Sequence, residues 1–169
     1  MKNILLILFL IFSKSASAAS VSEYDMKATY IFNFIAFTSW PNLANSESIN
    51  VCLIGRDNFG QSIKTIEGKK VNGVPIAVAR ISSMSSAKKC HLLYVAEREA
   101  TNIRLVYNEL SNSPVLVITD TTVPSGAMIN LYLEGQKLMF EIDQTRAKSA
   151  GLQISSKLLQ YSKPMLVQE

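Results

Sequence analysis

Residues 128–159, MINLYLEGQKLMFEIDQTRAKSAGLQISSKLL, decide how the end of the chain folds, because their hydrophobic pattern changes period halfway. Apolar residues alternate with other residues over 129–134 and again over 137–142, which is the period of two expected of half-buried strands. Gly135-Gln136 separates the two runs, and glycine at the first position of a two-residue loop suits a type II′ turn. The first half of the stretch therefore predicts an antiparallel hairpin.

The second half of the stretch predicts two short helices. Asp143 can cap the start of the first helix, and Gly151 is typical of its end. Ser155, or the serine that follows it, can then cap a final helix. The alternative is one continuous helix over 144–161, which would place Gly151 inside a helix at a cost of about 1 kcal/mol. We prefer the interrupted arrangement.

The composition fits one soluble domain. A chain of 169 residues with 48% hydrophobic content is ample for a single core. The formal net charge of +4 includes Lys2 and Lys14, which lie in an N-terminal leader. The other charges are dispersed, without a Lys/Arg cluster interleaved with aromatic residues, so we expect no nucleic-acid binding.

The leader, residues 1–19, has the pattern of a signal peptide. Lys2 precedes an apolar run over 4–12, and the A-x-A pattern at 16–18 predicts cleavage after Ala18 or Ala19. A membrane anchor is the alternative, but a run of nine residues is too short for a bilayer about 30 Å thick. We therefore expect an exported protein in the periplasm, with a single domain over 20–169.

Export changes the interpretation of the two cysteines. Cys52 and Cys90 form an even pair in a chain bound for an oxidising compartment, which favours a disulfide. Cys52 lies within a predicted strand over 49–54, and Cys90 lies just before a predicted strand over 91–96. Neighbouring parallel strands would bring the two together. The alternative is two separate buried thiols that behave as small hydrophobic residues.

The first helix is expected over 21–40, before Pro41. Its aromatic stripe of Tyr30, Phe34 and Phe37 faces either the core, which we favour, or a ligand or partner.

Strands alternate with helices along the rest of the chain. We expect strands over 49–54, 74–81, 92–96 and 115–120, and helices over 57–66 and 99–110. This order predicts an α/β fold with a single layered domain: a mixed, mostly parallel sheet flanked by helices, with the C-terminal antiparallel hairpin at its edge.

The sequence contains no catalytic constellation. His91 is the only histidine, and we expect it to be structural. Glu141 and Asp143 share a strand face, but nothing nearby would separate their pKa values. Asp120 ends a predicted strand, where α/β sheets place ligand contacts, and a turn-forming role is the alternative. We therefore expect no enzyme, no metal site and no cofactor.

Several motifs resemble the YfiR family of small bacterial periplasmic proteins. Residues 27–41 resemble the family's opening K-A-x-Y-x-x-N-F-x-x-F-x-x-W-P motif. Residues 126–130, 137–142 and 150–159 resemble its G-x-M-I-N, K/R-L-x-F-E-I and A-G-L-x-I-S-S-x-L-L motifs, in the same order. The resemblance extends over nearly all of the chain after the leader.

The resemblance implies a periplasmic repressor of an inner-membrane diguanylate cyclase. Such proteins bind the periplasmic sensor region of the cyclase and hold cyclic-di-GMP and biofilm formation low. In some systems an outer-membrane lipoprotein sequesters the repressor, and a homodimer is one arrangement in the family. Partner-binding residues do not follow from the motifs. The alternative is a periplasmic small-ligand sensor, or an accessory to a transporter or two-component receptor, that uses a pocket near Asp120 and the first-helix aromatics.

Overall fold

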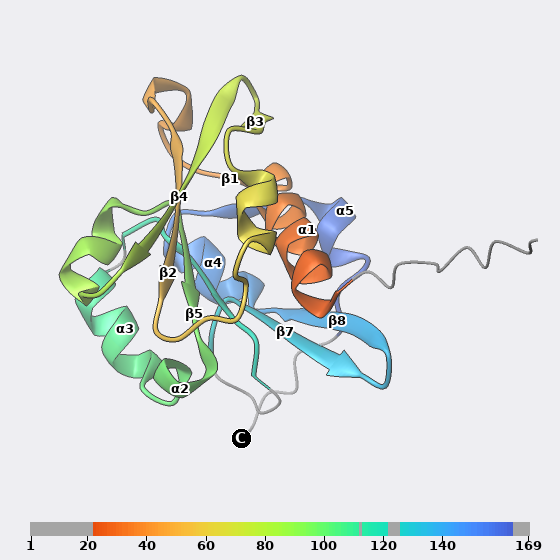
Figure 1. Cartoon of the computed structure of the whole chain (residues 1–169). Helices are drawn as coiled ribbons and strands as arrows, with labels where there is room; N and C mark the ends of the chain where they lie inside the picture. The colour runs from red at the N-terminus through yellow and green to blue at the C-terminus, as the bar shows by residue number, and fades with distance from the viewer. Residues whose placement is uncertain (1–21, 112, 122–125, 164–169) are drawn as a thin grey trace, which may run out of the picture.

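The computed structural model describes residues 22–111, 113–121 and 126–163, so the predicted signal peptide lies outside the described residues. Its centre is a seven-stranded sheet ordered β3-β4-β2-β5-β6-β7-β8 (Figure 1). The strands are β2 (Ile49–Ile54), β3 (Lys70–Val71), β4 (Val74–Ile81), β5 (Leu92–Val95), β6 (Leu116–Thr119), β7 (Ile129–Glu134) and β8 (Lys137–Ile142). The run from β4 to β7 is parallel, whereas β3 and β8 are antiparallel to their neighbours. The predicted mixed, mostly parallel α/β fold with a C-terminal hairpin is confirmed.

The central strands are buried on both faces, which explains why they are continuously apolar. In β2, Val51 and Leu53 face one hydrophobic cluster, while Cys52 and Ile54 face the other. The first cluster includes side chains of α1 (Glu23–Ala36), η2 (Ser62–Ile66), α4 (Gln144–Ser149) and α5 (Ser156–Leu159). The second is covered by η3 (Met84–Lys89), α2 (Glu97–Ala100) and α3 (Ile103–Leu110). Each sheet face therefore has its own helical layer.

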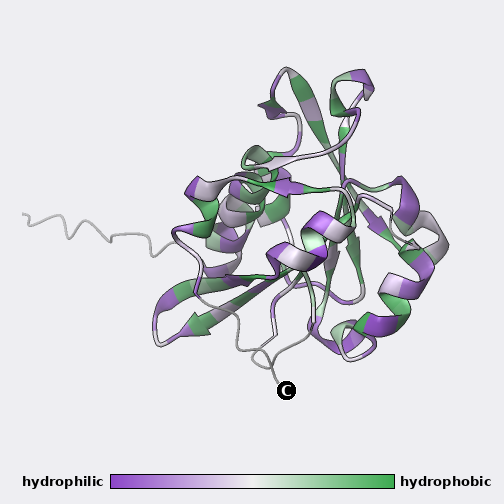
Figure 2. Ribbon diagram, turned by 180° about the vertical axis from the view of Figure 1, so that it is seen from behind, coloured by the Kyte–Doolittle hydropathy of each residue, from purple (hydrophilic) through white to green (hydrophobic). Residues whose placement is uncertain are grey.

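The C-terminal stretch folds as its pattern predicts. The β7–β8 hairpin alternates hydrophobic and hydrophilic residues along its length (Figure 2), and Gly135 adopts a φ of 63° in the turn. Asp143 caps α4 by accepting a hydrogen bond from the backbone N–H of Arg146 at 2.8 Å. Gly151 has a φ of 79° and separates α4 from α5, so the interrupted arrangement is confirmed.

The first helix is shorter than predicted, because α1 ends at Ala36 rather than continuing to Trp40. The backbone N–H of Phe37 donates to the carbonyl of Asn33 at 2.9 Å and closes the helix. The next two residues form β1 (Thr38–Ser39), which pairs antiparallel with β9 (Gln153–Ile154) in a separate two-stranded sheet. Pairing with β9 gives this backbone its hydrogen-bond partners, so the chain has no need to remain helical.

Two further helix predictions were wrong in extent. The helix expected over 57–66 is only the short 3₁₀-helix η2, because the carboxylate of Asp57 binds Arg80 and the backbone N–H of Phe59 instead of capping a helix. The helix expected over 99–110 is divided into α2 and α3, with Asn102 at a non-helical φ of −109° between them. The strand β3 and the 3₁₀-helix η1 (Leu43–Asn45) were not predicted as such.

Candidate functional site

An apolar groove lies between the C-terminal half of α1, strand β8 and helix α5, which are neighbours in Figure 1. Its volume is about 760 Å³, and it is lined by Tyr30, Asn33, Phe34, Phe37, Leu138, Met139, Phe140, Lys157, Leu158, Gln160 and Tyr161. We call this surface the apolar groove. It combines segments that are more than a hundred residues apart in the sequence, so no local motif predicts it.

The floor and the rim of the apolar groove differ in burial. Phe34 and Phe140 are buried in the floor, with ring centroids 5.2 Å apart in an edge-to-face contact. At the rim, Phe37 is 38% exposed and Tyr161 is 76% exposed. The predicted aromatic stripe is therefore divided: Phe34 packs in the core as we favoured, whereas Phe37 faces outward. Exposed aromatic residues beside an apolar groove are typical of interaction surfaces.

The apolar groove also borders the end of the sheet, because β8 is an edge strand. Two contacts cover part of this edge. The hydroxyl of Tyr30 donates to the carbonyl of Leu138 at 3.3 Å, and the backbone N–H of Lys163 donates to the carbonyl of Phe140 at 2.9 Å. Edge strands that remain accessible are sites where another chain can add.

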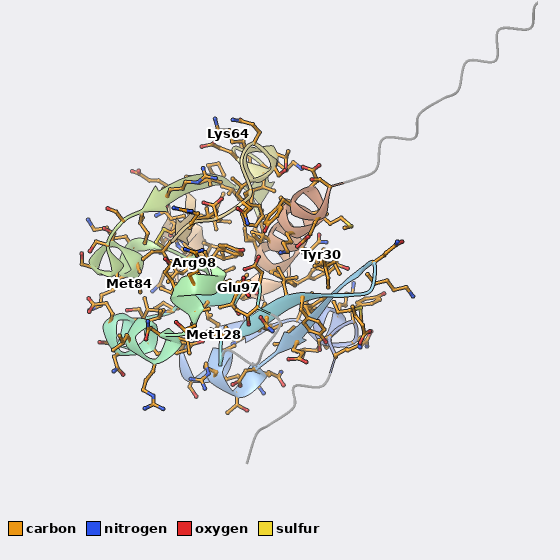
Figure 3. The ribbon with its side chains drawn as sticks, turned by 60° about the horizontal axis from the view of Figure 1, so that its bottom comes forward. Tyr30, Lys64, Met84, Glu97, Arg98 and Met128 are labelled. Atoms are coloured by element: carbon orange, nitrogen blue, oxygen red, sulfur yellow. A yellow bond between two sulfur atoms is a disulfide. The ribbon has the colours of Figure 1, made fainter. Side chains whose placement is uncertain are left out.

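A second, polar pocket lies at the carboxyl edge of the sheet. Strands β2, β5 and β6 are parallel neighbours, so the residues that follow them meet at one edge. The cavity measures about 300 Å³ and is lined by Tyr24, Arg56, Asp57, Asn58, Tyr94, Ala96, Glu97, Arg98 and Asp120. Figure 3 shows Glu97 and Arg98 on the underside of the molecule, where α2 begins. We call this site the polar pocket.

A buried ion pair lies beside the polar pocket. The ammonium group of Lys27, from α1, lies 2.7 Å from the Asp120 carboxylate and 2.6 Å from that of Glu23. The side chains of Lys27 and Asp120 are only 5% and 8% exposed. Burial alone would lower the pKa of Lys27, but the hydrogen bonds from Lys27 to Asp120 and Glu23 outweigh burial and raise the pKa above its ordinary value. Lys27 is therefore charged and committed to these partners.

Two more pocket residues are held in place by neighbours. Asp57 accepts hydrogen bonds from Arg80 at 2.8 and 2.9 Å. Burial would raise the pKa of Asp57, but Arg80 and the Phe59 N–H lower it overall, so Asp57 is ionised and neutralised. Tyr94 is buried at the end of β5. Its burial, followed by the charge and hydrogen bonding of Asp120, raises the pKa of its hydroxyl, which therefore stays protonated.

Of the residues that the sequence analysis singled out, Asp120 lines the polar pocket, and the first-helix aromatics Tyr30, Phe34 and Phe37 line the apolar groove. The carboxylates of Glu141 and Asp143 have separate partners: Glu141 accepts from Tyr132 at 3.4 Å, and Asp143 caps α4. Lys27, Arg56 and Arg98 were not singled out by sequence reasoning. The one available signal was position, since Arg56 and Arg98 follow predicted strands.

His91 occupies a structural position at the amino edge of the sheet. Its Nδ1 accepts a hydrogen bond from the backbone N–H of Asn50 at 3.0 Å, and its Nε2 lies 3.4 Å from the Ser46 hydroxyl. Burial lowers the pKa of His91. Because Nδ1 accepts an N–H, the ring is neutral with its proton on Nε2.

Cys52 and Cys90 are joined by a disulfide, with their Cα atoms 5.9 Å apart. Both cysteines belong to the cluster beneath η3 and α3, on the face of the sheet opposite α1. The disulfide thus touches neither the apolar groove nor the polar pocket.

Clusters of metal ligands and membrane-spanning helices are both absent from the described residues. Within 22–111, 113–121 and 126–163, no group of three or more His, Cys, Asp or Glu side chains is placed to hold a metal ion. No helix in the same ranges is long and apolar enough to cross a membrane.

Comparison with known proteins identifies the family. The chain resembles, at 12% sequence identity and a TM-score of 0.54, the crystal structure of a conserved domain protein from Vibrio cholerae O1 biovar El Tor. That similarity covers 85% of this chain and 60% of the Vibrio chain, and it supports the fold alone. No curated protein matches the sequence. The family model described as YfiR/HmsC-like matches residues 24–163, which is most of the chain, and the protein belongs to that family.

Proposed function

We propose that this protein is a periplasmic regulator that binds the periplasmic region of an inner-membrane diguanylate cyclase and represses it. The observation that carries the proposal is the family match over residues 24–163. In this account the exported protein, freed of its signal peptide near Ala18 or Ala19, holds cyclic-di-GMP and biofilm formation low. Binding represses only if the protein binds the inactive state of the cyclase more tightly than the active one.

The apolar groove supports the proposal by offering a surface for the cyclase. Protein–protein contacts are dominated by a few aromatic or apolar anchors near a fully desolvated centre. Phe37 and Tyr161 are such anchors at the rim, and Leu133, which is 41% exposed, lies opposite Leu138 in the hairpin. These three residues account for most of the large exposed hydrophobic side chains among the described residues. The exposed apolar surface is thus concentrated on one side of the molecule.

The experiment is to measure cellular cyclic-di-GMP in the native host with the gene deleted and then restored. The proposal predicts a rise on deletion that the exported protein reverses. An unchanged cyclic-di-GMP level, under conditions where the gene is expressed, would refute the proposal. The same surface would also serve an outer-membrane lipoprotein that sequesters the repressor, or a second copy of this chain. Co-purification from the envelope, with the wild type and with Phe37→Ser/Tyr161→Ser, tests both.

The second candidate function, a sensor of a small molecule, is favoured by one specific observation. The polar pocket is a cavity of about 300 Å³ at the sheet edge where α/β folds bind ligands. This function is compatible with repression, since one domain can carry both a partner surface and a ligand site.

A further inference from the structure

The rim of the polar pocket carries two guanidinium groups that form no salt bridge within the described residues. Arg56 follows β2 and Arg98 lies in the first turn of α2, and both line the cavity. No salt bridge involves either guanidinium group within the described residues 22–111, 113–121 and 126–163. In contrast, the cations behind the rim are committed: Lys27 to Asp120 and Glu23, and Arg80 to Asp57.

The groups that hold the floor of the polar pocket are fixed. The hydroxyl of Tyr24 accepts a hydrogen bond from the Asn58 side chain at 3.0 Å. Its ring packs edge-to-face against Phe59 at 5.3 Å, and Phe59 packs in the same way against Tyr94 at 5.0 Å. A ligand that enters the pocket therefore meets a wall whose geometry already exists, and binding need not order that wall.

The Lys27–Asp120 pair adds a second observation. Removing two charges from water costs several kcal/mol per ion, and a well-packed apolar pair at the same place is often at least as stable. The fold retains the costly arrangement directly at the cavity, which Tyr94 and Asp120 both line. Buried ionisable clusters in a cleft mark candidate binding sites.

We propose that the polar pocket binds a small organic or inorganic anion, with a carboxylate or phosphate group held by Arg56 and Arg98. Guanidinium groups match the planar, two-oxygen geometry of these anions and bind them more strongly than neutral donors do. The volume of about 300 Å³ limits the ligand to a small molecule. Glu97 lines the same rim, but it is exposed, so solvent and salt screen its charge and it does not close the site to an anion. This inference deepens the second candidate function, the small-molecule sensor, and it does not depend on binding to the cyclase.

The test is isothermal titration calorimetry of the purified protein with inorganic phosphate and, separately, with succinate, at constant ionic strength. We expect at least one probe to bind at millimolar concentration or below, and to raise the thermal midpoint of the same sample. Binding of phosphate alone would assign a phosphorylated ligand, and binding of succinate alone would assign a carboxylate. No binding of either probe overturns the proposal.

The variants locate the site. Arg56→Ala and Arg98→Ala are each expected to weaken binding by about tenfold or more, because each removes charge-assisted hydrogen bonds. Arg98→Lys keeps the charge but not the fork of donors, and is expected to fall between the wild type and Arg98→Ala. Arg104→Ala, at an exposed position of α3 outside the pocket, is the charge-matched control and should bind as the wild type does. Equal binding by the wild type and both pocket variants would place the anion elsewhere and overturn the proposal.

Discussion

The apolar groove and the polar pocket lie at opposite ends of the same helix, and each has a packed floor and an exposed rim. Tyr24, near the start of α1, lines the polar pocket, and Phe34 and Phe37, near its end, line the apolar groove. In both places the floor is committed to the fold, through aromatic packing in one and ion pairs in the other. In both places the side chains of the rim are exposed to solvent. We therefore expect floor residues to govern stability and rim residues to govern recognition.

The largest expected effect is the loss of stability on substituting Lys27, beneath the polar pocket. Lys27→Met leaves the Asp120 carboxylate buried without its cation, and we expect it to lower the free energy of unfolding by about 3–5 kcal/mol. Chemical denaturation measures this loss. The double variant Lys27→Met/Asp120→Leu should recover most of it, because the one carboxylate left without Lys27 is that of Glu23, which is 37% exposed. A single variant within about 0.5 kcal/mol of the wild type would show that this floor does not support the fold.

The disulfide lines neither the apolar groove nor the polar pocket, so removing it tests stability without altering either surface directly. Replacing Cys52 and Cys90 together by serine is expected to lower the free energy of unfolding by about 4 kcal/mol, since the bond spans a sequence separation of 38 residues. Reduced wild-type protein should show the same loss. We hypothesise that this loosening also weakens repression. A Cys52→Ser protein with unchanged thermal stability and partner affinity would contradict the hypothesis.

The rim of the apolar groove is expected to act on affinity rather than on stability. Tyr161→Ala should change the free energy of unfolding by less than about 0.5 kcal/mol, because the side chain is 76% exposed. The same variant should weaken binding to the periplasmic region of the cyclase by about tenfold or more, as loss of an aromatic anchor does. Leu105→Ala, at an exposed position of α3 outside the groove, is the matched control. Surface plasmon resonance with the immobilised periplasmic region compares the three proteins.

The smallest expected effect is the pH dependence of stability that arises from His91, at the amino edge of the sheet. Because burial lowers the pKa of His91, the unfolded chain, in which the group titrates near its ordinary value of 6.5, binds more protons than the native protein below that pH. Stability is therefore complete above pH 6.5 and decreases as the pH falls below it. Urea midpoints at about pH 7.5 and about pH 5.5 measure this decrease. His91→Asn keeps an acceptor for the Asn50 N–H and cannot become charged, so its midpoint should vary less over the same range.

Local pattern predicted the parts of the fold that local chemistry determines. The period of two over the hairpin, the cap at Asp143 and the stop at Gly151 each depend on residues close in sequence, and each is confirmed. The continuous apolar run before Asp120 likewise predicted a buried strand with Asp120 at its end, in a position that proved to border a pocket.

Features that depend on distant partners could not be predicted in this way. The end of α1 is determined by the pairing of Thr38 with Ile154, far along the chain. Lys27 has the pattern of an ordinary helix residue, yet it is buried because Asp120 lies 93 residues away in sequence and 2.7 Å away in space. The apolar groove depends on α1, β8 and α5 packing together, which no single segment encodes.

The most direct test of the central claim is to restore the deleted gene with variants of each rim and measure cellular cyclic-di-GMP. We predict that the exported wild type and the Arg56→Ala/Arg98→Ala protein lower cyclic-di-GMP, whereas Phe37→Ser/Tyr161→Ser, present at the same periplasmic level, leaves it raised. A groove variant that represses as fully as the wild type would contradict the assignment of the apolar groove as the surface that binds the cyclase.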